Sequence, residues 1–446
     1  MIKSKQIKEY EFELDYFIDE SVVGYLKYEV IYEVVNVTDV FVNDKYRRQG
    51  IATELFNYLF NSVKPEKFML EVNKNNLSAI NLYKKFGFVT IHVRKKYYKD
   101  GDALIMESKV RKDVYILAIE SSCDETSVSI VKNGNVDVAT TVNSQIDVHK
   151  KYGGVVPEVA SRMHLENITF VLDETLSKAD MKLEDMDAFA CTYAPGLLGS
   201  LLVGLETAKT LSLIYNKPFI KVNHMMGHIY ANNIGNNMSY PLLALIVSGG
   251  HTDLIYMKSE TSIEYVGQTL DDAVGECFDK VARIVNLPYP GGPNVEKLAL
   301  NGKDTYPMPN LLSDGSTNFS FSGIKSHVVN LAHNEKQRGN SINEEDLCCS
   351  FQNAVTKSLV SKTLLALNKT GAKNMIMAGG VASNSFIRES MRKMCEENNI
   401  NFSVPDKKYC TDNGTMIGAA AYILYKNNKF AGLDTNAKSH ELLNLS

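Results

Sequence analysis

Two histidines four positions apart carry the strongest chemical signal in this 446-residue sequence. On a helix, His224 and His228 would share one face and could both bind one metal ion. Asp412, just ahead of the helical run 416–424, offers a hard oxygen ligand. Two imidazoles and one carboxylate suit iron(II) or zinc with open coordination positions, and the sequence does not choose between them. Two purely structural histidines are the alternative.

The residue after His224 argues against the simplest hydrolytic chemistry. A zinc peptidase of the His-Glu-x-x-His type places its general base directly after the first histidine. In this chain that position holds Met225. The sequence therefore favours a metal centre that lacks the peptidase base.

Polar and glycine-rich turns supply a second group of candidate residues. Ser248–Gly250 and Gly379–Gly380 each follow an apolar, strand-like run. Backbone amides in such turns can face a phosphate or a sugar, although many tight turns share this composition. Asp124 and Glu125 occupy a polar turn between two further strands. Cys123 beside them is the obvious nucleophile candidate, but a thiol in a turn is more often a packing residue.

A different chemical signal lies near the start of the chain. Residues 46–52, Tyr-Arg-Arg-Gln-Gly-Ile-Ala, follow a strand and open a helix. Gly50 lets the backbone approach a ligand closely, and a helix N-terminus offers free N–H groups to an anion. Arg47 and Arg48 add positive charge suited to a pyrophosphate. An ordinary basic helix start is the alternative interpretation of this motif.

The elements that must position these residues alternate between strands and helices, which indicates an α/β protein. Ahead of the basic stretch 108–112, strand and helix patterns follow one another at 34–42, 51–63, 68–72, 78–86, 89–93 and 103–106. Beyond it, strands are expected at 115–120, 127–131, 242–247, 253–256 and 375–378. The chain therefore reads as two unequal parts, 1–112 and 113–446.

Composition excludes several classes of protein. Apolar residues make up 44% and charged residues 22%, values that disordered or fibrous chains do not have. The net charge of −4 means that any RNA contact must be a local patch, for which we consider Arg94, Lys95, Lys96 and Lys99. No apolar run reaches about 18 residues, so no membrane span is expected. Seven scattered cysteines indicate free thiols and a cytoplasmic location.

The motifs of the first part resemble the GNAT acetyltransferases, specifically the ribosomal-protein alanine acetyltransferases (RimI), over about residues 10–107. The resemblance rests on residues 46–52, 70–73 and 76–88. It implies acetyl-CoA as cofactor, with its pyrophosphate held by Arg47, Arg48, Gln49, Gly50, Ile51 and Ala52. It also implies Glu71 as the general base that deprotonates an amine and Tyr83 as the general acid that protonates the departing thiolate. The implied acceptor is the N-terminal alanine of a ribosomal protein.

The acceptor side of this first part departs from the family pattern. The family places a strand and two helices before its second strand, and those helices help to form the acceptor cleft. Here only about 10 to 20 residues precede the matching strand. A vestigial, regulatory or partner-completed transferase is therefore the alternative.

The second part, from about residue 114 to the end, resembles the tRNA threonylcarbamoyladenosine transferases (TsaD). The matching runs, in order, are 119–126, 152–162, 224–228, 248–252, 319–325 and 410–414. The family has the ASKHA fold of actin, sugar kinases and heat-shock ATPases. The two resemblances together imply a GNAT domain at 1–112 followed by a two-lobed ASKHA (actin-like ATPase) fold at 113–446. Lobe I is expected at about 113–239 plus the C-terminal helix, and lobe II at about 240–414.

The second resemblance also implies site residues and a reaction. His224, His228 and Asp412 match metal ligands, and Asp124 and Glu125 match acidic positions needed for activity. The implied contacts to the substrate adenylate are Ile246, Val247, Ser248, Gly249, Gly250, Asp279, Gly292 and Asn384. The reaction moves a threonylcarbamoyl group from threonylcarbamoyl-AMP to N6 of adenosine 37 in tRNAs that read codons beginning with A.

The implied partners are tRNA and two bacterial helper subunits, the paralogue TsaB and the ATPase TsaE. Three other functions remain open for the second part. They are a zinc endopeptidase, an ATP-driven kinase or chaperone on the same fold, and a non-catalytic tRNA scaffold. Fold alone does not exclude the second of these.

Overall fold

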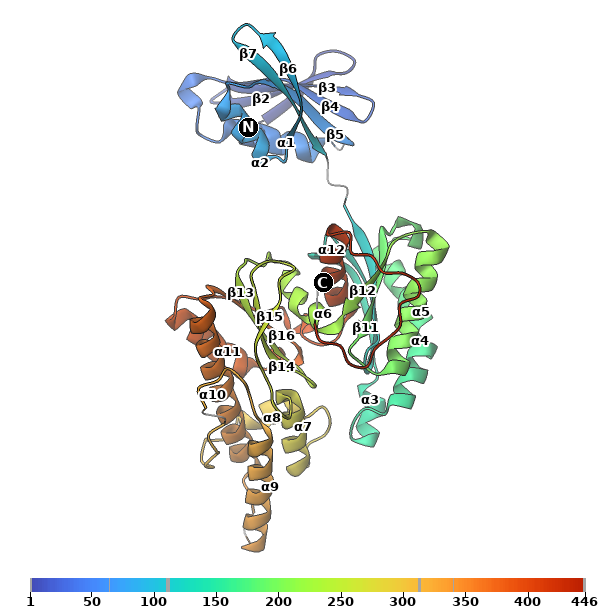
Figure 1. Cartoon of the computed structure of the whole chain (residues 1–446), viewed down its shortest axis with the longest axis vertical. Coiled ribbons are helices and arrows are strands. Elements are labelled where there is room, and N and C mark those ends of the chain that lie inside the picture. The colour runs from blue at the N-terminus through green and yellow to red at the C-terminus, as the bar shows by residue number, and fades with distance from the viewer. Residues whose placement is uncertain (1, 64, 110–112, 312–313, 340, 444–446) are drawn as a thin grey trace. The chain divides into compact units, whose positions relative to one another are not determined.

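The computed structural model describes residues 2–63, 65–109, 113–311, 314–339 and 341–443 (Figure 1). The chain divides into two compact units, 1–112 and 113–446. Residues 110–112, on which the expected junction falls, lie outside the described residues. Among the helices of the described ranges, none combines the length and the hydrophobicity of a membrane-spanning segment.

The first unit is a seven-stranded sheet with the strand order β1-β2-β3-β4-β5-β7-β6. Its strands are β1 (Ile2–Gln6), β2 (Glu11–Ile18), β3 (Ser21–Ile31), β4 (Val34–Val42), β5 (Lys67–Asn73), β6 (Val89–Tyr98) and β7 (Gly101–Lys109). Helix α1 (Ile51–Ser62) connects β4 to β5, and α2 (Leu77–Lys85) connects β5 to β6. The apolar face of α1, with Leu55, Phe56 and Leu59, is fully buried against the sheet, as the helical period requires.

Strands β4 and β5 are hydrogen-bonded to each other over only the first half of their length. They pair in parallel only from Val34–Val37 to Lys67–Leu70. Beyond that point β4 runs on to Val42 and β5 to Asn73, with no ladder between them. The facing backbone edges of the parted strands are therefore available to a ligand.

The connection between β1 and β2 is a short turn, residues 7–10, and the two strands pair as an antiparallel hairpin. No helix stands between them among the described residues 2–18. The sequence predicted that the helices of the acceptor side are missing before β2. At this place the structure has a direct hairpin.

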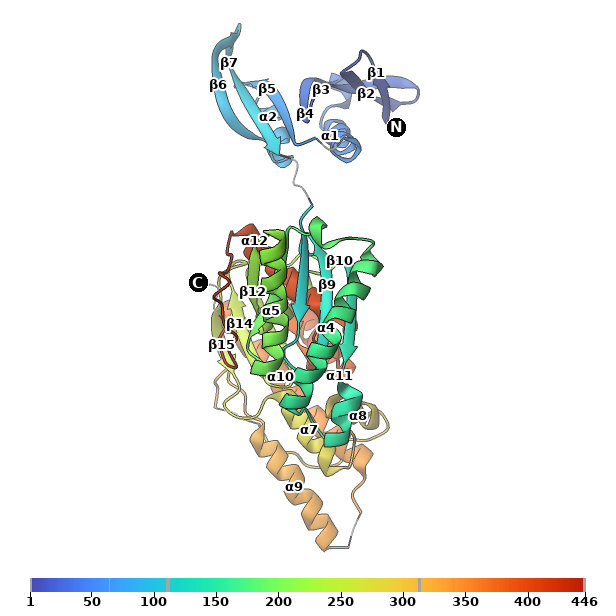
Figure 2. The same ribbon diagram turned by 90° about the vertical axis from the view of Figure 1, so that its right-hand side faces the viewer.

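The second unit contains two five-stranded sheets of the same topology (Figures 1 and 2). The first sheet has the order β10-β9-β8-β11-β12, and the second the order β15-β14-β13-β16-β17. In each, the strand that comes first in sequence lies at the centre, with an antiparallel meander on one side and two parallel strands on the other. We call the halves built on these sheets lobe I and lobe II.

Lobe I consists of β8 (Tyr115–Glu120), β9 (Glu125–Lys132), β10 (Val136–Ser144), β11 (Ala188–Ala194), β12 (Phe219–Asn223), α3 (Ile146–His149), α4 (Pro157–Ala179), α5 (Leu198–Tyr215), α6 (His224–Tyr230) and α12 (Gly414–Lys426). Lobe II consists of β13 (Leu242–Val247), β14 (Thr252–Met257), β15 (Glu264–Gln268), β16 (Asn374–Ala378), β17 (Asn401–Ser403), α7 (Val274–Ile284), α8 (Gly291–Ala299), α9 (Ser322–Gln337), α10 (Glu344–Thr370) and α11 (Ser385–Glu397).

Helices α6 and α12 lie between the two sheets (Figure 1). Strand β13 is buried on both faces, which explains its continuous apolar sequence Leu-Leu-Ala-Leu-Ile-Val. One face packs against α6 and α12, and the other against the helices of lobe II. The lobes therefore share a continuous core at the level of α6. This layered, mixed α/β arrangement confirms the expected fold class.

Candidate metal centre and transferase sites

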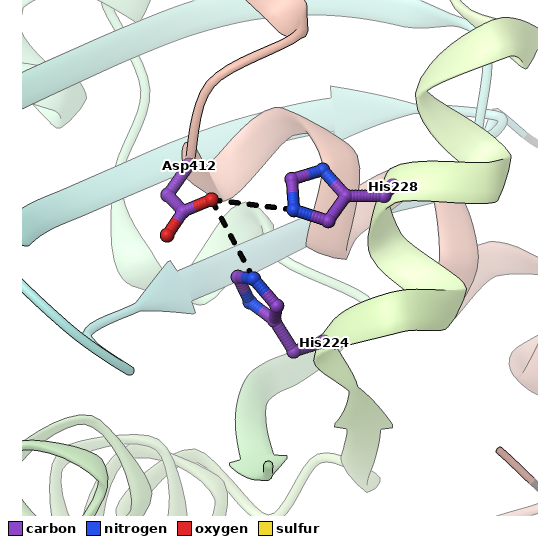
Figure 3. Close-up of side chains that lie close together, drawn as sticks. All are labelled: His224, His228 and Asp412. Atoms are coloured by element: carbon purple, nitrogen blue, oxygen red, sulfur yellow. Dashed lines mark ion pairs between the residues drawn. The ribbon is translucent and has the colours of Figure 1, made fainter. Parts of the chain in front are cut away.

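The two histidines and the aspartate predicted as metal ligands come together between the lobes (Figure 3). One potential ligand atom from each of His224, His228 and Asp412 lies within 4.8 Å of the others. Asp412 Oδ1 is 3.5 Å from His224 Nε2 and 3.3 Å from His228 Nε2. The imidazole rings are nearly perpendicular, with centroids 4.6 Å apart. All three side chains thus converge on one point.

Local sequence explains this convergence. The side chain of Asn223 caps α6 by accepting a hydrogen bond from Met225 N, so the helix begins at His224. Gly227 has no side chain because a Cβ there would lie 2.7 Å from Ile417 Cδ1 of α12. The close approach of α6 and α12 brings the loop before α12, which carries Asp412, to the histidines.

The donor set fits a divalent cation. His228 is 1% exposed, yet neither of its ring nitrogens makes a hydrogen bond. An unpaired imidazole of this kind is costly unless another partner, such as a metal ion, completes it. Burial disfavours charge on His224, but the carboxylates of Asp412 and Glu120 raise its pKa to about 9. Against burial, the two imidazoles lower the pKa of Asp412 to about 2. The carboxylates therefore favour positive charge among these side chains, which a bound cation would supply in place of a proton.

The acidic turn of lobe I adjoins this cluster. The pKa of Glu125 is raised to about 10, mainly by burial and further by the carboxylates of Asp412 and Asp124. Burial and the same carboxylates also raise the pKa of the Cys123 thiol. A thiol held in its protonated form is a poor nucleophile, which agrees with the packing interpretation of Cys123.

The turn Ser248–Gly250 is held by two other glycines. A Cβ at Gly379 would lie 2.4 Å from Val247 O, and one at Gly275 would lie 2.6 Å from Ser248 O. On the open side, a Cβ at Gly249 or Gly250 would meet nothing within 4 Å. The turn therefore rests on a close backbone support, its Ser248 N donates to His251 O at 2.9 Å, and the space beside Gly249 and Gly250 is open. Ile246 and Val247, at the end of β13, are fully buried beneath it.

His251 places this turn beside the candidate metal ligands. Burial, followed by the nearby His224 and His228, lowers the pKa of His251 to about 4. A charge interaction of this kind requires the turn of lobe II to face α6 of lobe I. The candidate adenylate turn and the candidate metal site therefore belong to one region of the molecule.

The remaining predicted nucleotide contacts have structural partners. Asp279 Oδ1 accepts a hydrogen bond from Gly291 N at 2.7 Å, at the N-terminus of α8. Asn384 caps α11 by accepting from Ile387 N, and its amide donates to Gln352. Asp279 and Gly291 line a cavity of about 370 Å³ whose opposite wall is residues 150–153 of lobe I. A cavity of this size lies within the usual range for small-ligand sites.

Sequence reasoning did not single out Glu120, at the end of β8. This carboxylate is fully buried, and its Oε2 lies 3.1 Å from His224 Nδ1. The residue stands inside the matching run 119–126, but only its burial and contact distinguish it from its neighbours.

In the first unit, the predicted pyrophosphate loop leads into α1. Gly50 caps the helix with φ = 87°, a conformation that L side chains rarely adopt. Arg47 pairs with Asp44 at 2.8 Å, and its Nε donates to Val42 O at the end of β4. Ile51 is buried and anchors the first turn of α1. The loop thus lies beside the parted ends of β4 and β5.

Glu71 and Tyr83 also belong to this region. Glu71 is the first residue of β5 beyond its pairing with β4, and it forms an ion pair with Arg94 at 2.9 Å. Tyr83 of α2 is 8% exposed. Burial raises its pKa to about 12, with smaller contributions from Tyr98 and from Asp39 of β4. At neutral pH Tyr83 therefore keeps the proton that a general acid must donate.

We expect Gly50→Ala to weaken acetyl-CoA binding about tenfold. An L residue at φ = 87° costs ~1–2 kcal/mol, so the loop would relax away from the geometry that presents its amides. Isothermal titration calorimetry with acetyl-CoA measures the effect. Gly87→Ala is the matched control, because Gly87 has a similar φ of 78° at the end of α2. Equal losses of affinity in both variants would contradict a special role for Gly50.

Two topologically equivalent lobes with a metal-ligand cluster between them define the second unit as a member of the actin-like ASKHA class. Residues 138–419 match the family described as tRNA N6-adenosine threonylcarbamoyltransferase (TsaD), and the chain belongs to this family of transferases. The first unit is a GNAT domain, because residues 5–88 match the acetyltransferase (GNAT) family.

Named relatives support the first of these assignments. The tRNA N6-adenosine threonylcarbamoyltransferase of Staphylococcus haemolyticus is 51% identical over 332 residues, which is 74% of this chain and 97% of the relative. The enzyme of Staphylococcus aureus strain Newman is 52% identical over 330 residues, again 74% and 97%.

Among solved structures, one similar chain is the ribosomal-protein-S18-alanine N-acetyltransferase of Escherichia coli. It is 24% identical, covers 24% of this chain and 72% of its own, and has a TM-score of 0.23. Component A of the (R)-2-hydroxyglutaryl-CoA dehydratase of Acidaminococcus fermentans is 16% identical, covers 69% and 98%, and has a TM-score of 0.43.

Proposed function

We propose that the second unit transfers the threonylcarbamoyl group of threonylcarbamoyl-AMP to N6 of adenosine 37 in tRNAs that read codons beginning with A. Relatives at 51–52% identity with this activity in their names support the reaction. The single structural observation that carries it is the convergence of His224, His228 and Asp412, whose potential ligand atoms lie within 4.8 Å of one another. The reaction takes place in the cytoplasm.

Each group has a role in this reaction. The exocyclic amine of adenine is a weak nucleophile, so the donor must be held in a reactive geometry. The open turn at Gly249 and Gly250 would orient the adenylate, and Asp279 lines the cavity that both lobes border. Gly292 and Asn384 are the further nucleotide contacts of this proposal. Asp124 and Glu125 position the acceptor adenosine and take part in the transfer of the proton that its N6 amine loses. His224, His228 and Asp412 would hold one divalent cation, iron(II) ahead of zinc, which polarises the donor when bound.

Reconstitution tests this proposal directly. The purified chain, the two helper subunits, threonylcarbamoyl-AMP and unmodified tRNA are incubated together, and the nucleosides are weighed by mass spectrometry. We expect threonylcarbamoyladenosine at position 37. Folded, metal-loaded protein that yields no modified nucleoside but hydrolyses ATP would favour an ASKHA ATPase instead.

A metallopeptidase is a weaker candidate for chemical reasons. Met225, where the peptidase base would stand, is buried. Glu120, the carboxylate in contact with His224, is fully buried and already accepts hydrogen bonds from Ser122 N and Thr192 Oγ1. It therefore has no access to a substrate water molecule.

We also propose that lobe I binds the paralogous helper subunit through α4 and α5. These helices pack side by side on one face of the lobe I sheet (Figure 2). Their outer surface exposes several large apolar side chains, namely Leu165, Phe170, Leu198, Leu202, Leu213 and Ile214. Such a concentration on two neighbouring helices is typical of a protein interface.

Changing Leu165 and Leu213 to Asp should abolish this association without unfolding the protein. Both side chains are more than 60% exposed, so the folded chain loses little by the change, whereas a buried interface would gain two unpaired charges. Analytical size exclusion with the helper subunit measures complex formation. Leu300→Asp, at a 78% exposed position on lobe II, is the control. Complex formation by the double variant would contradict the proposed interface.

For the first unit, we propose acetyl transfer from acetyl-CoA to the N-terminal alanine of a ribosomal protein. The GNAT match, the Arg47–Ala52 loop and the parted strands support acetyl-CoA as donor. The direct β1–β2 hairpin favours the alternative that this domain is vestigial or regulatory. Incubation with acetyl-CoA and ribosomal proteins, followed by intact-mass analysis, decides between the two.

A further inference from the structure

A buried carboxylate stands directly behind one of the candidate metal ligands. Glu120 ends β8, the central strand of lobe I, and its side chain is completely excluded from solvent. Its Oε2 lies 3.1 Å from His224 Nδ1, on the side of the imidazole opposite the atom that faces Asp412. A buried carboxylate is expensive unless it is paired and hydrogen-bonded, so its position calls for a partner of matching chemistry.

Glu120 is itself held in place by two donors. Its Oε1 accepts a hydrogen bond from Ser122 N at 2.6 Å, and its Oε2 accepts one from Thr192 Oγ1 at 2.5 Å. Ser122 and Thr192 belong to the turn after β8 and to the neighbouring strand β11. The carboxylate is therefore fixed by the sheet of lobe I and has little freedom to rotate.

The contact decides which nitrogen of His224 faces the cluster as a ligand. A carboxylate accepts hydrogen bonds, so in the neutral imidazole that binds a cation Glu120 favours the tautomer with its proton on Nδ1, from which Ser122 Oγ also lies 3.2 Å away. Nε2, 3.5 Å from Asp412, is then the atom with the lone pair for a cation. A carboxylate behind a ligating imidazole also makes that imidazole a stronger donor.

His228 lacks any such support. Its Nδ1 is buried without a hydrogen-bond partner. The two histidines therefore differ: Glu120 contacts Nδ1 of His224, whereas Nδ1 of His228 has no hydrogen-bond partner among the described residues.

We propose that Glu120 is a positioning residue that fixes the orientation and tautomer of His224 and thereby sets the metal affinity of the site. This inference rests on the proposed function, since it assumes that His224, His228 and Asp412 hold a metal ion. Glu120 acts through His224 and does not touch substrate, because it is sealed from solvent and its oxygens are occupied.

Metal affinity, measured apart from activity, tests the inference. Glu120→Gln keeps the size of the side chain and removes its charge. We expect the dissociation constant for Zn²⁺, determined by competition with a chromogenic chelator, to rise about 10- to 100-fold. The visible spectrum of the Co²⁺-substituted protein should shift, because the donor strength of one ligand changes. Glu120→Asp, which keeps the charge but shortens the reach, should restore part of the affinity.

Asp253→Asn is the matched control. Asp253 is also a buried carboxylate, 8% exposed, and its pKa is raised to about 6 by burial alone. Neutralising it should leave Zn²⁺ affinity and the Co²⁺ spectrum unchanged.

Three outcomes are informative. Weaker binding in Glu120→Gln with partial recovery in Glu120→Asp supports the inference. Wild-type affinity and spectrum in a folded Glu120→Gln protein overturn it while leaving the proposed metal site intact. A wild-type protein that binds no metal overturns the metal site and the inference together. Should Glu120→Gln not fold, Glu120→Asp alone still decides, because wild-type affinity in that variant shows that the position of the carboxylate is unimportant.

Discussion

His228→Ala is expected to eliminate tRNA modification while the second unit remains folded. A bound cation supplies several kcal/mol of transition-state stabilisation, so its loss corresponds to a decrease of about 10³-fold or more. The ring of His228 makes no hydrogen bond that the substitution would break, and its main interaction is with Asp412. The cost in stability is therefore limited to the small cavity that remains, ~1–3 kcal/mol.

Two measurements on each variant check this expectation. Nucleoside mass spectrometry after reconstitution reports modification, and elemental analysis of the purified protein reports bound metal. Wild-type protein stripped with a chelator should resemble His228→Ala and should recover when the metal is restored. His333→Ala, at an exposed position of α9, controls for the removal of an imidazole as such. Undiminished modification by a metal-free His228→Ala protein would exclude a metal role in the reaction.

The sequence was most informative where spacing translates directly into geometry. His224 and His228 are four residues apart, and any helix at that point brings their imidazoles to one face. The structure brings Asp412, which was predicted as the third ligand, to within 4.8 Å of them, although it lies 184 positions after His228 in the sequence. Their ligand roles remain predictions, whereas the two families and the fold class are confirmed by the family matches.

Burial and pairing could not be predicted from the sequence. Glu120 reads as an ordinary acidic strand end, and only the sheet of lobe I shows that His224 is its partner. Strand β1, Ile-Lys-Ser-Lys-Gln, has almost no apolar pattern and is an exposed edge strand, so it left no signal. Asn384 shows a different limit, because its side chain caps α11 and a structural role accompanies the predicted nucleotide contact.

The length of the first unit was more informative than its residue types. Only residues 7–10 connect β1 to β2, and the structure shows a four-residue turn there. The donor side, by contrast, keeps its loop, its parted strands and its two candidate catalytic residues. The first unit therefore keeps the predicted acetyl-CoA loop and joins β1 to β2 by a direct hairpin.

Tyr83→Phe is expected to lower acetyl transfer by about 10²- to 10⁴-fold, the usual contribution of a positioned general acid. The phenylalanine keeps the ring contacts with Phe56 and Phe88, so the core of the first unit should be unchanged. Because burial raises the pKa of Tyr83 from 10 to about 12, its proton is present throughout the neutral and mildly alkaline range. Loss of the hydroxyl, and not a change in its charge, is what the variant measures.

The matched control is Tyr28→Phe, which removes a second buried hydroxyl from the same core. Acetyl-CoA affinity should be the same in both variants, because neither residue belongs to the Arg47–Ala52 loop. A selective loss of transfer in Tyr83→Phe would identify the thiolate-protonating group and establish the domain as a working transferase. Wild-type protein that binds acetyl-CoA tightly but transfers nothing to any ribosomal protein would instead make the domain an acetyl-CoA sensor. The direct hairpin between β1 and β2, with no helix between them among the described residues 2–18, would then be the physical reason.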